Sequence, residues 1–386
     1  MDQRNNSHIP FALPDIGDDE INEVVTCLKS GWLTTGPLTK KLEAQFAAYL
    51  NVKHALAVNS GTAGLHLAIE AIGIKKGDKV ATSVYTFTAT AEVIRYLQAD
   101  PVFIDIDPET LNIDTNQLIQ KIDKTIDAII PVHFAGQACE MDTIAAVAQQ
   151  FELKIVEDAA HAIPCSYKGK KIGKIGNCTM FSFYVTKPMA TGEGGMVVTD
   201  SDEIADRIRV MRLHGINRDI WNRYRDNKPN WFYEVIEPGF KYNMPDLMAA
   251  IGIHQLRKAE RLQKRRQAIA RRYDEAFMNL PLKIPYVSDT EDLHAWHLYV
   301  IQLDLERISI SRDEFIEQMA EKGIGTSVHF IPLHLHPYWR DRYGLSPEDF
   351  PVALDCYHRA TSLPIYSKMS DDQVAQVIQA VTKILK

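Results

Sequence analysis

The sequence predicts an α/β protein in which a large domain, built on a mostly parallel central sheet flanked by helices, precedes a smaller α+β domain. Between about residues 54 and 200, short apolar runs alternate with helical patterns, as in βαβ units. A long helical pattern starts near Asp246, and the composition after "NLPLKIP" changes to a mixture of helices and extended segments. We therefore expect an N-terminal segment and the large domain in residues 1–250, and a connecting helix with the small domain in residues 251–386.

The apolar runs of the large domain are bounded by glycine, proline and aspartate, which commonly interrupt strands. Because a parallel strand is covered on both faces, a continuous apolar run predicts such a strand. The expected strands are HALAVN (54–59), DKVATS (78–83), DPVFIDID (100–107), DAIIPVHF (127–134), LKIVEDAA (153–160), CTMFSF (178–183) and GMVVT (195–199). The expected helices are SGTAGLHLAIEAIG (60–73), FTATAEVIRYLQ (87–98), NQLIQKI (116–122), DTIAAVAQQF (142–151) and DEIADRIRVMRLHG (202–215).

Less regular patterns follow in the second half of the chain. Residues 216–244 are polar and aromatic with little periodicity, which favours a binding loop or a subunit contact. The basic stretch "LRKAERLQKRRQAIARRYDEAF" has apolar residues at helical spacing, so we interpret its charges as the outer face of an amphipathic helix. The small domain is expected to contain AWHLYVIQLD (295–304), GTSVHFIP (325–332) and helices around RDEFIEQMAEKG (312–323) and DDQVAQVIQAVTKIL (371–385).

The composition argues against several classes of protein. The chain is 46% hydrophobic and 24% charged, as is ordinary for globular proteins, and its net charge of −7 argues against nucleic-acid binding. The 5 cysteines are scattered without a CxxC pair, so neither a disulfide framework nor a zinc ribbon is indicated. The N-terminal residues lack the apolar segment of a secretory signal, and no apolar run approaches the ~20 residues that span a bilayer. We therefore expect a cytoplasmic protein that binds neither nucleic acid nor membrane.

Small polar residues lie where the first predicted strand gives way to a helix, in "VNSGTAG". Ser60, Gly61 and Thr62 allow a ligand to approach the backbone closely, and the helix N-terminus offers unpaired N–H groups to an anion. This pattern indicates a phosphate site. The alternative is an ordinary helix cap, because serine and threonine are favoured there for their own hydrogen bonds.

Three further strand ends carry residues suited to chemistry. In "KIVEDAAHA", Asp158 ends an apolar strand, where a carboxylate is costly unless it meets a cation or caps a helix. Lys187 lies between "MFSF" and "TGEGG", and a lysine withdrawn from water is a nucleophile toward aldehydes, whereas most lysines are surface charges. In "SVYTFTAT", Phe87 or Tyr85 can stack on a flat ligand or pack in the core.

Taken together, these four segments describe a site for pyridoxal phosphate (PLP). The aldehyde of this cofactor requires an amine, its pyridinium nitrogen an anion, and its phosphate a set of N–H donors. The sequence contains a candidate for each requirement.

The motifs "SGWLTTGP", "VNSGTAGLHLA", "PVHFAGQACEMD", "IVEDAAHA", "TKPMATGEGGMVVT", "PGFKYNMPD" and "VHFIPLHLHPYW" resemble, in order, those of the DegT/StrS family of PLP-dependent sugar aminotransferases. The resemblance covers nearly the whole chain. It implies the fold type I aminotransferase architecture and a homodimer whose active sites are shared between subunits. It also implies a transfer of the amino group from glutamate, leaving 2-oxoglutarate, to a keto sugar linked to a nucleotide.

The resemblance also implies roles for individual residues. Lys187 is expected to be the Schiff-base lysine that moves the proton, Asp158 the partner of the pyridine nitrogen, and His161 a catalytic neighbour of the ring. Asn243 is expected to reach the cofactor phosphate of the neighbouring subunit. The remaining expected contacts are those of the ring face (Phe87), the phosphate (Ser60, Gly61, Thr62, Ser182) and the substrate (His329, Tyr184).

The same motifs resemble most closely those of enzymes that aminate the 4-keto position, so we expect a 4-keto-6-deoxy hexose or a related sugar for a bacterial lipopolysaccharide, capsule or glycoprotein. A 3-aminotransferase is the alternative. A sugar dehydratase of this family carries histidine in place of Lys187, and a PLP-binding regulator would need a DNA-binding module that the sequence does not suggest. His329, His334 and His336 lack accompanying carboxylate or cysteine ligands, so we expect substrate contact or packing for them and no metal.

Overall fold

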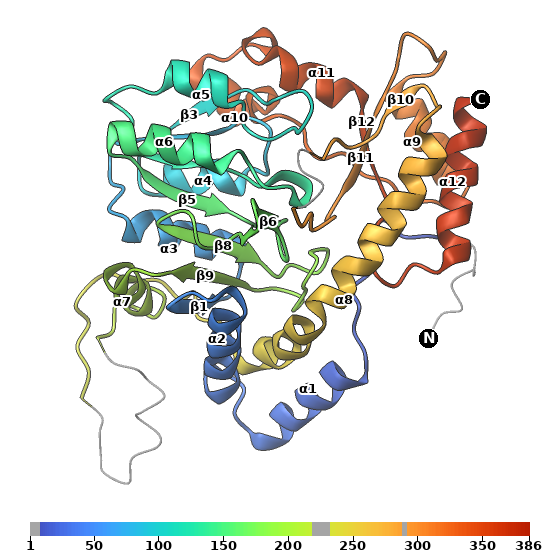
Figure 1. The fold of residues 1–386 in the computed structure, drawn as a ribbon. Helices are drawn as coiled ribbons and strands as arrows, with labels where there is room; N and C mark the ends of the chain where they lie inside the picture. The colour runs from blue at the N-terminus through green and yellow to red at the C-terminus, as the bar shows by residue number, and fades with distance from the viewer. Residues whose placement is uncertain (1–7, 218–231, 288–291) are drawn as a thin grey trace.

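The computed structural model describes residues 8–217, 232–287 and 292–386. Its centre is a seven-stranded sheet with the strand order β1-β9-β8-β5-β4-β2-β3 (Figure 1). The strands are β1 (His54–Val58), β2 (Lys79–Ser83), β3 (Asp100–Ile104), β4 (Ala128–Ile130), β5 (Lys154–Asp158), β8 (Cys178–Ser182) and β9 (Gly195–Thr199). Only β9 among them runs antiparallel to its neighbours, so the prediction of a mostly parallel sheet is confirmed.

Two apolar cores cover the two faces of this sheet, because successive residues of each strand point to opposite sides. In β5, for example, Ile155 belongs to one core and Val156 to the other. One core receives side chains from α3 (Gly61–Ala71), α4 (Ala89–Tyr96) and α7 (Asp202–Met211). The other receives them from α2 (Pro37–Leu50), α5 (Thr115–Lys121), α6 (Met141–Phe151) and the start of α8 (Asp246–Phe277).

Helix α8 runs from the N-terminal helices to a second, three-stranded sheet (Figure 1). This antiparallel sheet consists of β10 (Leu282–Lys283), β11 (Tyr299–Leu303) and β12 (Ala360–Leu363), and it contributes to a separate apolar core. The remaining elements are α1 (Asp18–Ser30), β6 (Ser166–Tyr167), β7 (Lys170–Lys171), α9 (Arg312–Glu321), α10 (Pro337–Tyr343), α11 (Pro351–Arg359), α12 (Asp371–Leu385) and the 3-10 turns η1 (Phe134–Gly136), η3 (Leu333–Leu335) and η4 (Pro347–Asp349).

Some details differ from the expectations. Residues 325–332 form an isolated bridge between Ser327 and Ser362 rather than a strand. Residues 218–231 of the irregular stretch at 216–244 lie outside the described residues, and the predicted boundary after residue 250 falls inside α8. The division into two domains therefore stays a prediction. Within the described residues, no helix combines the length and apolarity needed to cross a membrane.

Candidate active site

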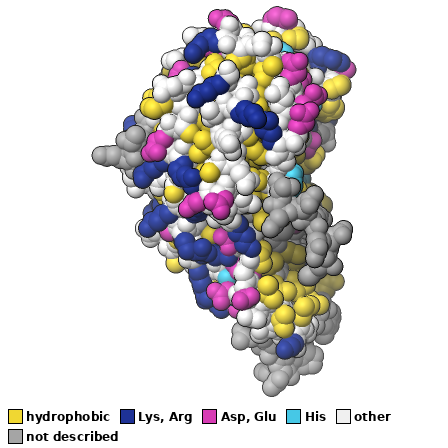
Figure 2. Space-filling model, turned by 90° about the vertical axis from the view of Figure 1, so that its right-hand side faces the viewer, with side chains coloured by type: hydrophobic (Ala, Val, Ile, Leu, Met, Phe, Trp, Pro, Cys, Tyr) yellow, Lys and Arg dark blue, Asp and Glu magenta, His cyan; other side chains and the backbone are white. Residues whose placement is uncertain are grey.

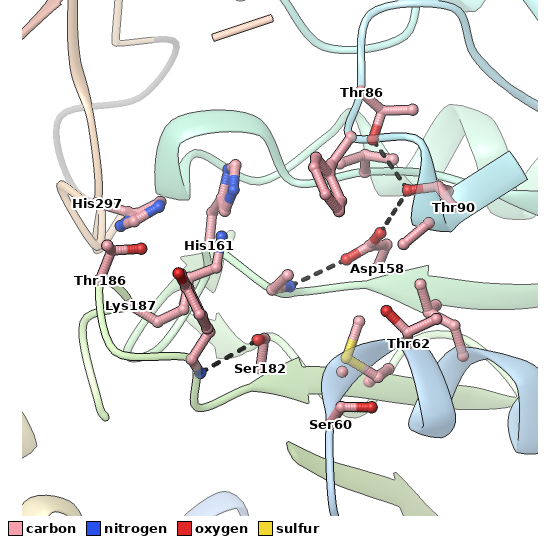
Figure 3. Close-up of a pocket in the computed structure, with 18 of the residues that line it drawn as sticks. Ser60, Thr62, Thr86, Thr90, Asp158, His161, Ser182, Thr186, Lys187 and His297 are labelled. Carbon is pink, nitrogen blue, oxygen red and sulfur yellow. Dashed lines mark hydrogen bonds between the residues drawn. The ribbon is translucent and has the colours of Figure 1, made fainter. Parts of the chain in front are cut away.

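A cavity of about 480 Å³ lies at the carboxyl ends of β5 and β8 and at the N-terminus of α3 (Figure 3). In open α/β sheets, this end of the strands is where ligands bind. The cavity brings together ten of the eleven residues that the sequence singled out, from segments more than 260 residues apart: Ser60, Gly61, Thr62, Phe87, Asp158, His161, Ser182, Tyr184, Lys187 and His329.

The eleventh residue, Asn243, does not line this cavity. Its side chain donates a hydrogen bond to Thr35 Oγ1 (2.5 Å) and accepts one from Lys241 Nζ (2.6 Å). This position leaves the predicted contact with a neighbouring subunit as an expectation.

Lys187 extends into the cavity from the loop that joins β8 to β9 (Figure 3). Its backbone N–H donates to the Tyr184 carbonyl (2.8 Å), which forms a tight turn just after the strand. Burial lowers the pKa of the Lys187 amine to about 8, and the negative charge of Asp158 opposes that shift only in part. The amine is therefore closer to its nucleophilic, uncharged form at neutral pH than an exposed lysine is.

We expect this shift to be measurable in cofactor-free protein. A pKa of about 8 makes the free-base fraction of Lys187 rise through that pH, whereas an exposed lysine rises only near about 10.4. Competitive acetylation with acetic anhydride from pH 6 to 11, followed by peptide mapping, measures the free-base fraction of each lysine. Lys174, an exposed residue, is the internal standard. A Lys187 midpoint that coincides with that of Lys174 would contradict the assignment of a desolvated amine.

Asp158 presents a buried carboxylate to the same cavity. Thr90 Oγ1 donates to one of its oxygens (2.8 Å), and the Ala160 N–H donates to the other (3.1 Å). Thr86 Oγ1 lies 2.9 Å from Thr90 Oγ1 and extends the chain of hydrogen bonds (Figure 3). Burial raises the pKa of Asp158, while the two donors and the charge of Lys187 lower it. Such a carboxylate is best satisfied by a cationic partner.

Aromatic rings and neutral imidazoles form the walls between these charges. His161 Nδ1 accepts a hydrogen bond from the Ala135 N–H (3.2 Å), and burial lowers the pKa of its ring well below the usual value. The ring is therefore neutral, with its proton on Nε2. It stacks on Phe330 (ring centres 6.0 Å apart) and contacts His297 (4.4 Å). Phe87 is 60% exposed and stands beside Phe330, so its ring is available to a flat ligand.

The candidate phosphate site around Ser60 lies at the N-terminus of α3. Ser60 caps α3 by accepting the Ala63 N–H (3.1 Å), and the amides of Gly61 and Thr62 occupy the first turn, which has no intrahelical acceptors. A Cβ on Gly61 would lie 3.0 Å from Ser182 Cβ and 3.1 Å from its hydroxyl oxygen, so glycine lets Ser182 pack closely against the start of α3. An anion, a basic ring nitrogen and an aldehyde would each meet a suitable group in this cavity.

The structure adds residues that sequence reasoning missed, among them Thr86, Thr90, His297, Phe330 and Glu193. The two threonines follow a strand end in "SVYTFTAT", where attention to polar residues as well as aromatic ones would have found them. His297 lies 110 residues after Lys187, and no local pattern links the two.

Two interpretations need correction or refinement. Tyr85 packs in the core and donates to the His329 carbonyl (2.7 Å), so it is not a stacking residue of the cavity. His334 is also buried, and its Nε2 lies 3.2 Å from the Pro347 carbonyl. Within the described residues, no cluster of three or more histidine, cysteine, aspartate or glutamate side chains has the arrangement of a metal site.

Comparison with known proteins relates this geometry to a family. The profile of the DegT/DnrJ/EryC1/StrS aminotransferase family matches residues 14–382. The spore coat polysaccharide biosynthesis protein SpsC of Bacillus subtilis is 51% identical, and the match covers 100% of this chain and 99% of SpsC. An uncharacterised protein of Methanocaldococcus jannaschii is 52% identical, with 98% of both chains covered.

Solved structures agree with the sequence relatives. Helicobacter pylori PseC, an aminotransferase involved in the biosynthesis of pseudoaminic acid, superposes with a TM-score of 0.91 at 27% identity, covering 98% of this chain and 99% of PseC. A Streptococcus pneumoniae protein described as a sugar aminotransferase, solved in its PLP-form, gives 0.88 at 32% identity, covering 98% of this chain and 100% of that chain. The predicted fold type I architecture is thereby confirmed. The chain belongs to the DegT/DnrJ/EryC1/StrS aminotransferase family.

Proposed function

We propose that this protein transfers an amino group from glutamate to a nucleotide-linked keto sugar, at the 4-keto position of a 4-keto-6-deoxy hexose or a related sugar, for a bacterial surface glycan. Its membership of an aminotransferase family makes it a PLP-dependent transaminase. The observation that carries the assignment to this cavity is the joint placement of a desolvated lysine amine and a buried carboxylate, Lys187 and Asp158, beside a helix N-terminus.

The residues present fit the cofactor, and we assign them roles on that basis. Bound pyridoxal phosphate supplies an aldehyde and a ring that accepts electrons. Gly61, Thr62 and Ser182 would hold the phosphate, with Ser60 ordering the turn of α3 that presents these amides. Asp158 would hold the pyridine nitrogen, and Phe87 would cover a face of the ring.

Lys187, Asp158 and His161 would each have a separate role in transamination. Lys187, uncharged in an appreciable fraction at neutral pH, would take the proton from the amino donor's α-carbon and return it during the transfer. Asp158 would keep a proton on the ring nitrogen, as its buried position and hydrogen bonds favour a charge partner. His161 stays neutral, so it would pack beside the ring without competing with Asp158 for positive charge.

A second, open groove of about 780 Å³ supports a nucleotide as part of the substrate. It shares Thr86, Phe87 and Phe330 with the main cavity, so one elongated ligand could occupy both spaces. Tyr96 and Tyr338 line it and are 51% and 55% exposed, as suits stacking on a nucleobase. His329 and Tyr184, which line the main cavity together with Lys187, are our candidates for contacts with the sugar.

A homodimer with shared active sites is part of the proposal. Helix α1 exposes Ile21, Val25 and Leu28 at spacings of four and three residues, which forms one apolar stripe on its surface. Hydrophobic side chains also gather at the lower end of the face shown in Figure 2. A second copy would cover such a stripe and could bring its Asn243 to this chain's cofactor phosphate. All five cysteines are buried and unpaired, which supports a reducing, cytoplasmic setting.

The substrate is testable with a panel of UDP-, GDP- and dTDP-linked keto sugars, each with the carbonyl at position 3 or position 4. Incubation with the holoenzyme and ¹⁵N-glutamate should place the label on carbon 4, as read by NMR of the product. Label on carbon 3 would favour the alternative 3-aminotransferase. Loss of a hydroxyl without labelling would indicate a dehydratase. A cofactor absorbance that glutamate does not change would indicate a PLP-binding regulator.

A further inference from the structure

Helix α8 carries buried polar side chains in, and immediately before, the basic stretch that the charge pattern assigned to an outer face. Gln255, Gln263 and Arg266 are only 1%, 1% and 4% exposed, so that interpretation is wrong for Arg266. Gln255 and Arg266 are eleven residues apart, or about three helical turns, and therefore point to the same side of the helix. Gln255 Oε1 and the Arg266 guanidinium contact the loops around the active site, while Gln255 Nε2 donates to Asp15 and Glu20.

Arg266 bonds to two segments that are far apart in the sequence. Its Nη1 donates to the Pro188 carbonyl (3.5 Å), in the residue immediately after Lys187. Its Nε donates to the Ala295 carbonyl (3.0 Å), two residues before His297. The guanidinium thus connects the loop that carries Lys187 with the segment that carries His297.

The neighbouring glutamines reinforce the same two segments. Gln255 Oε1 accepts the Ala190 N–H (3.4 Å), three residues after Lys187. Gln263 Nε2 donates to the His294 carbonyl (2.8 Å). Each of the two loops is therefore held by one glutamine and by Arg266, which is the member common to both.

Arg266 has an unusual electrostatic setting for a residue whose only role is stability. Among the described residues it forms no ion pair, and its Nη2 has no hydrogen-bond partner. A small, separate cavity of about 20 Å³ lies against Arg266 and is also lined by Lys187, His297 and Asp15. That volume accommodates one water molecule, which would complete the hydrogen bonds of the guanidinium. Burial lowers the pKa of Arg266 to about 9, with Asp15 opposing the shift.

A buried charge without an ion-pair partner is costly, and replacing buried charges by apolar side chains of similar volume is often neutral for stability. We infer that Arg266 is a positioning residue. By bridging the carbonyls of Pro188 and Ala295, it fixes the positions of Lys187 and His297 relative to each other behind the active-site cavity. This inference rests on the proposed function for its kinetic consequence. The geometry itself concerns only this chain's loops.

The first test compares Arg266→Met and Arg266→Lys with Arg271→Met, an exposed arginine of the same helix that serves as the matched control. Arg266→Met should lower kcat at least about 10-fold while KM for glutamate changes less than about 3-fold, because misplacing a reacting group affects the chemical step most. Arg266→Lys keeps the charge but lacks the planar fork that reaches both carbonyls, so it should fold and still show the kcat loss. Arg271→Met should match the unmodified enzyme.

Two measurements separate positioning from general destabilisation. Guanidinium at low millimolar concentration should restore activity to Arg266→Ala and leave Arg271→Ala unchanged. In cofactor-free protein, hydrogen exchange of residues 186–191 and 294–297 should accelerate together in Arg266→Lys while the central sheet stays protected. An Arg266→Lys enzyme with normal kcat, or exchange that does not change in either segment, would overturn the inference. If the wild-type protein fails to transaminate, the proposed function fails, but the exchange result still decides the positioning role.

Discussion

Replacing Lys187 with alanine is expected to lower kcat for repeated amination by at least about 10³-fold, because one side chain supplies both the amine that reacts with aldehydes and the base that moves the proton. Among the described residues that line the cavity Lys187 is the only lysine, and burial brings its pKa to about 8. Continuous assay of 2-oxoglutarate formation measures the loss. A single-turnover experiment shows whether any amino group is transferred once.

Lys174→Ala is the matched control, since it removes the same functional group from an exposed position outside the cavity. Thermal unfolding of both variants should remain close to that of the unmodified enzyme, because the loop around residue 187 keeps its backbone bonds. A Lys187→Ala enzyme that still completes many turnovers would show that another group carries the reaction.

The same variant tests whether the active sites are shared. In a mixed dimer of Lys187→Ala and Asn243→Ala chains, one site contains both lesions and the other contains neither, provided that Asn243 acts on the partner's cofactor. Random reassortment of equal amounts should then restore about a quarter of the normal activity. Activity no greater than the sum of the two parents would mean that Asn243 acts in the site of its own chain's Lys187, or would exclude a dimer that exchanges subunits.

The parts of the site that the sequence predicted are those with a signal within a few neighbouring residues. Ser60, Gly61 and Thr62 mark a junction of strand and helix, and Asp158 ends an apolar strand, so topology alone brings them to one edge of the sheet. Lys187 stands between an apolar strand and a glycine turn. The role of each residue additionally depended on resemblance to a family, since each local pattern has an ordinary structural explanation.

The parts that the sequence did not predict depend on packing between distant segments. His297 reaches the cavity because its backbone N–H bonds to the Ala135 carbonyl (3.0 Å), a contact that no periodicity encodes. Arg266 belongs to a helix rich in basic residues, where periodicity identifies faces but not the element that covers each face. Tyr85 and Phe87 are two residues apart in one segment, yet Tyr85 is buried and Phe87 is exposed to the cavity.

Replacing Asp158 with asparagine should have the second largest effect, a fall in kcat of about 10²-fold or more with little change in cofactor loading. Asparagine preserves the size of the side chain, so it can still accept the Ala160 N–H, and its amide can donate to Thr90 Oγ1. What it loses is the negative charge. Without that charge the ring nitrogen has no anionic partner to hold its proton, so the ring accepts electrons less well.

The fall in kcat should come from a slower first half-reaction. Stopped-flow absorbance measures that rate after holoenzyme is mixed with glutamate. Asp341→Asn, which removes a carboxylate from the exposed end of α10, is the control and should react at the normal rate. Asp158 is buried, and its charge is stabilised by the Thr90 and Ala160 donors and by the charge of Lys187, so asparagine removes a charge that this surrounding is built to hold. An Asp158→Asn enzyme that reacts within about 3-fold of the normal rate would therefore mean that the ring is oriented differently and that another group faces its nitrogen.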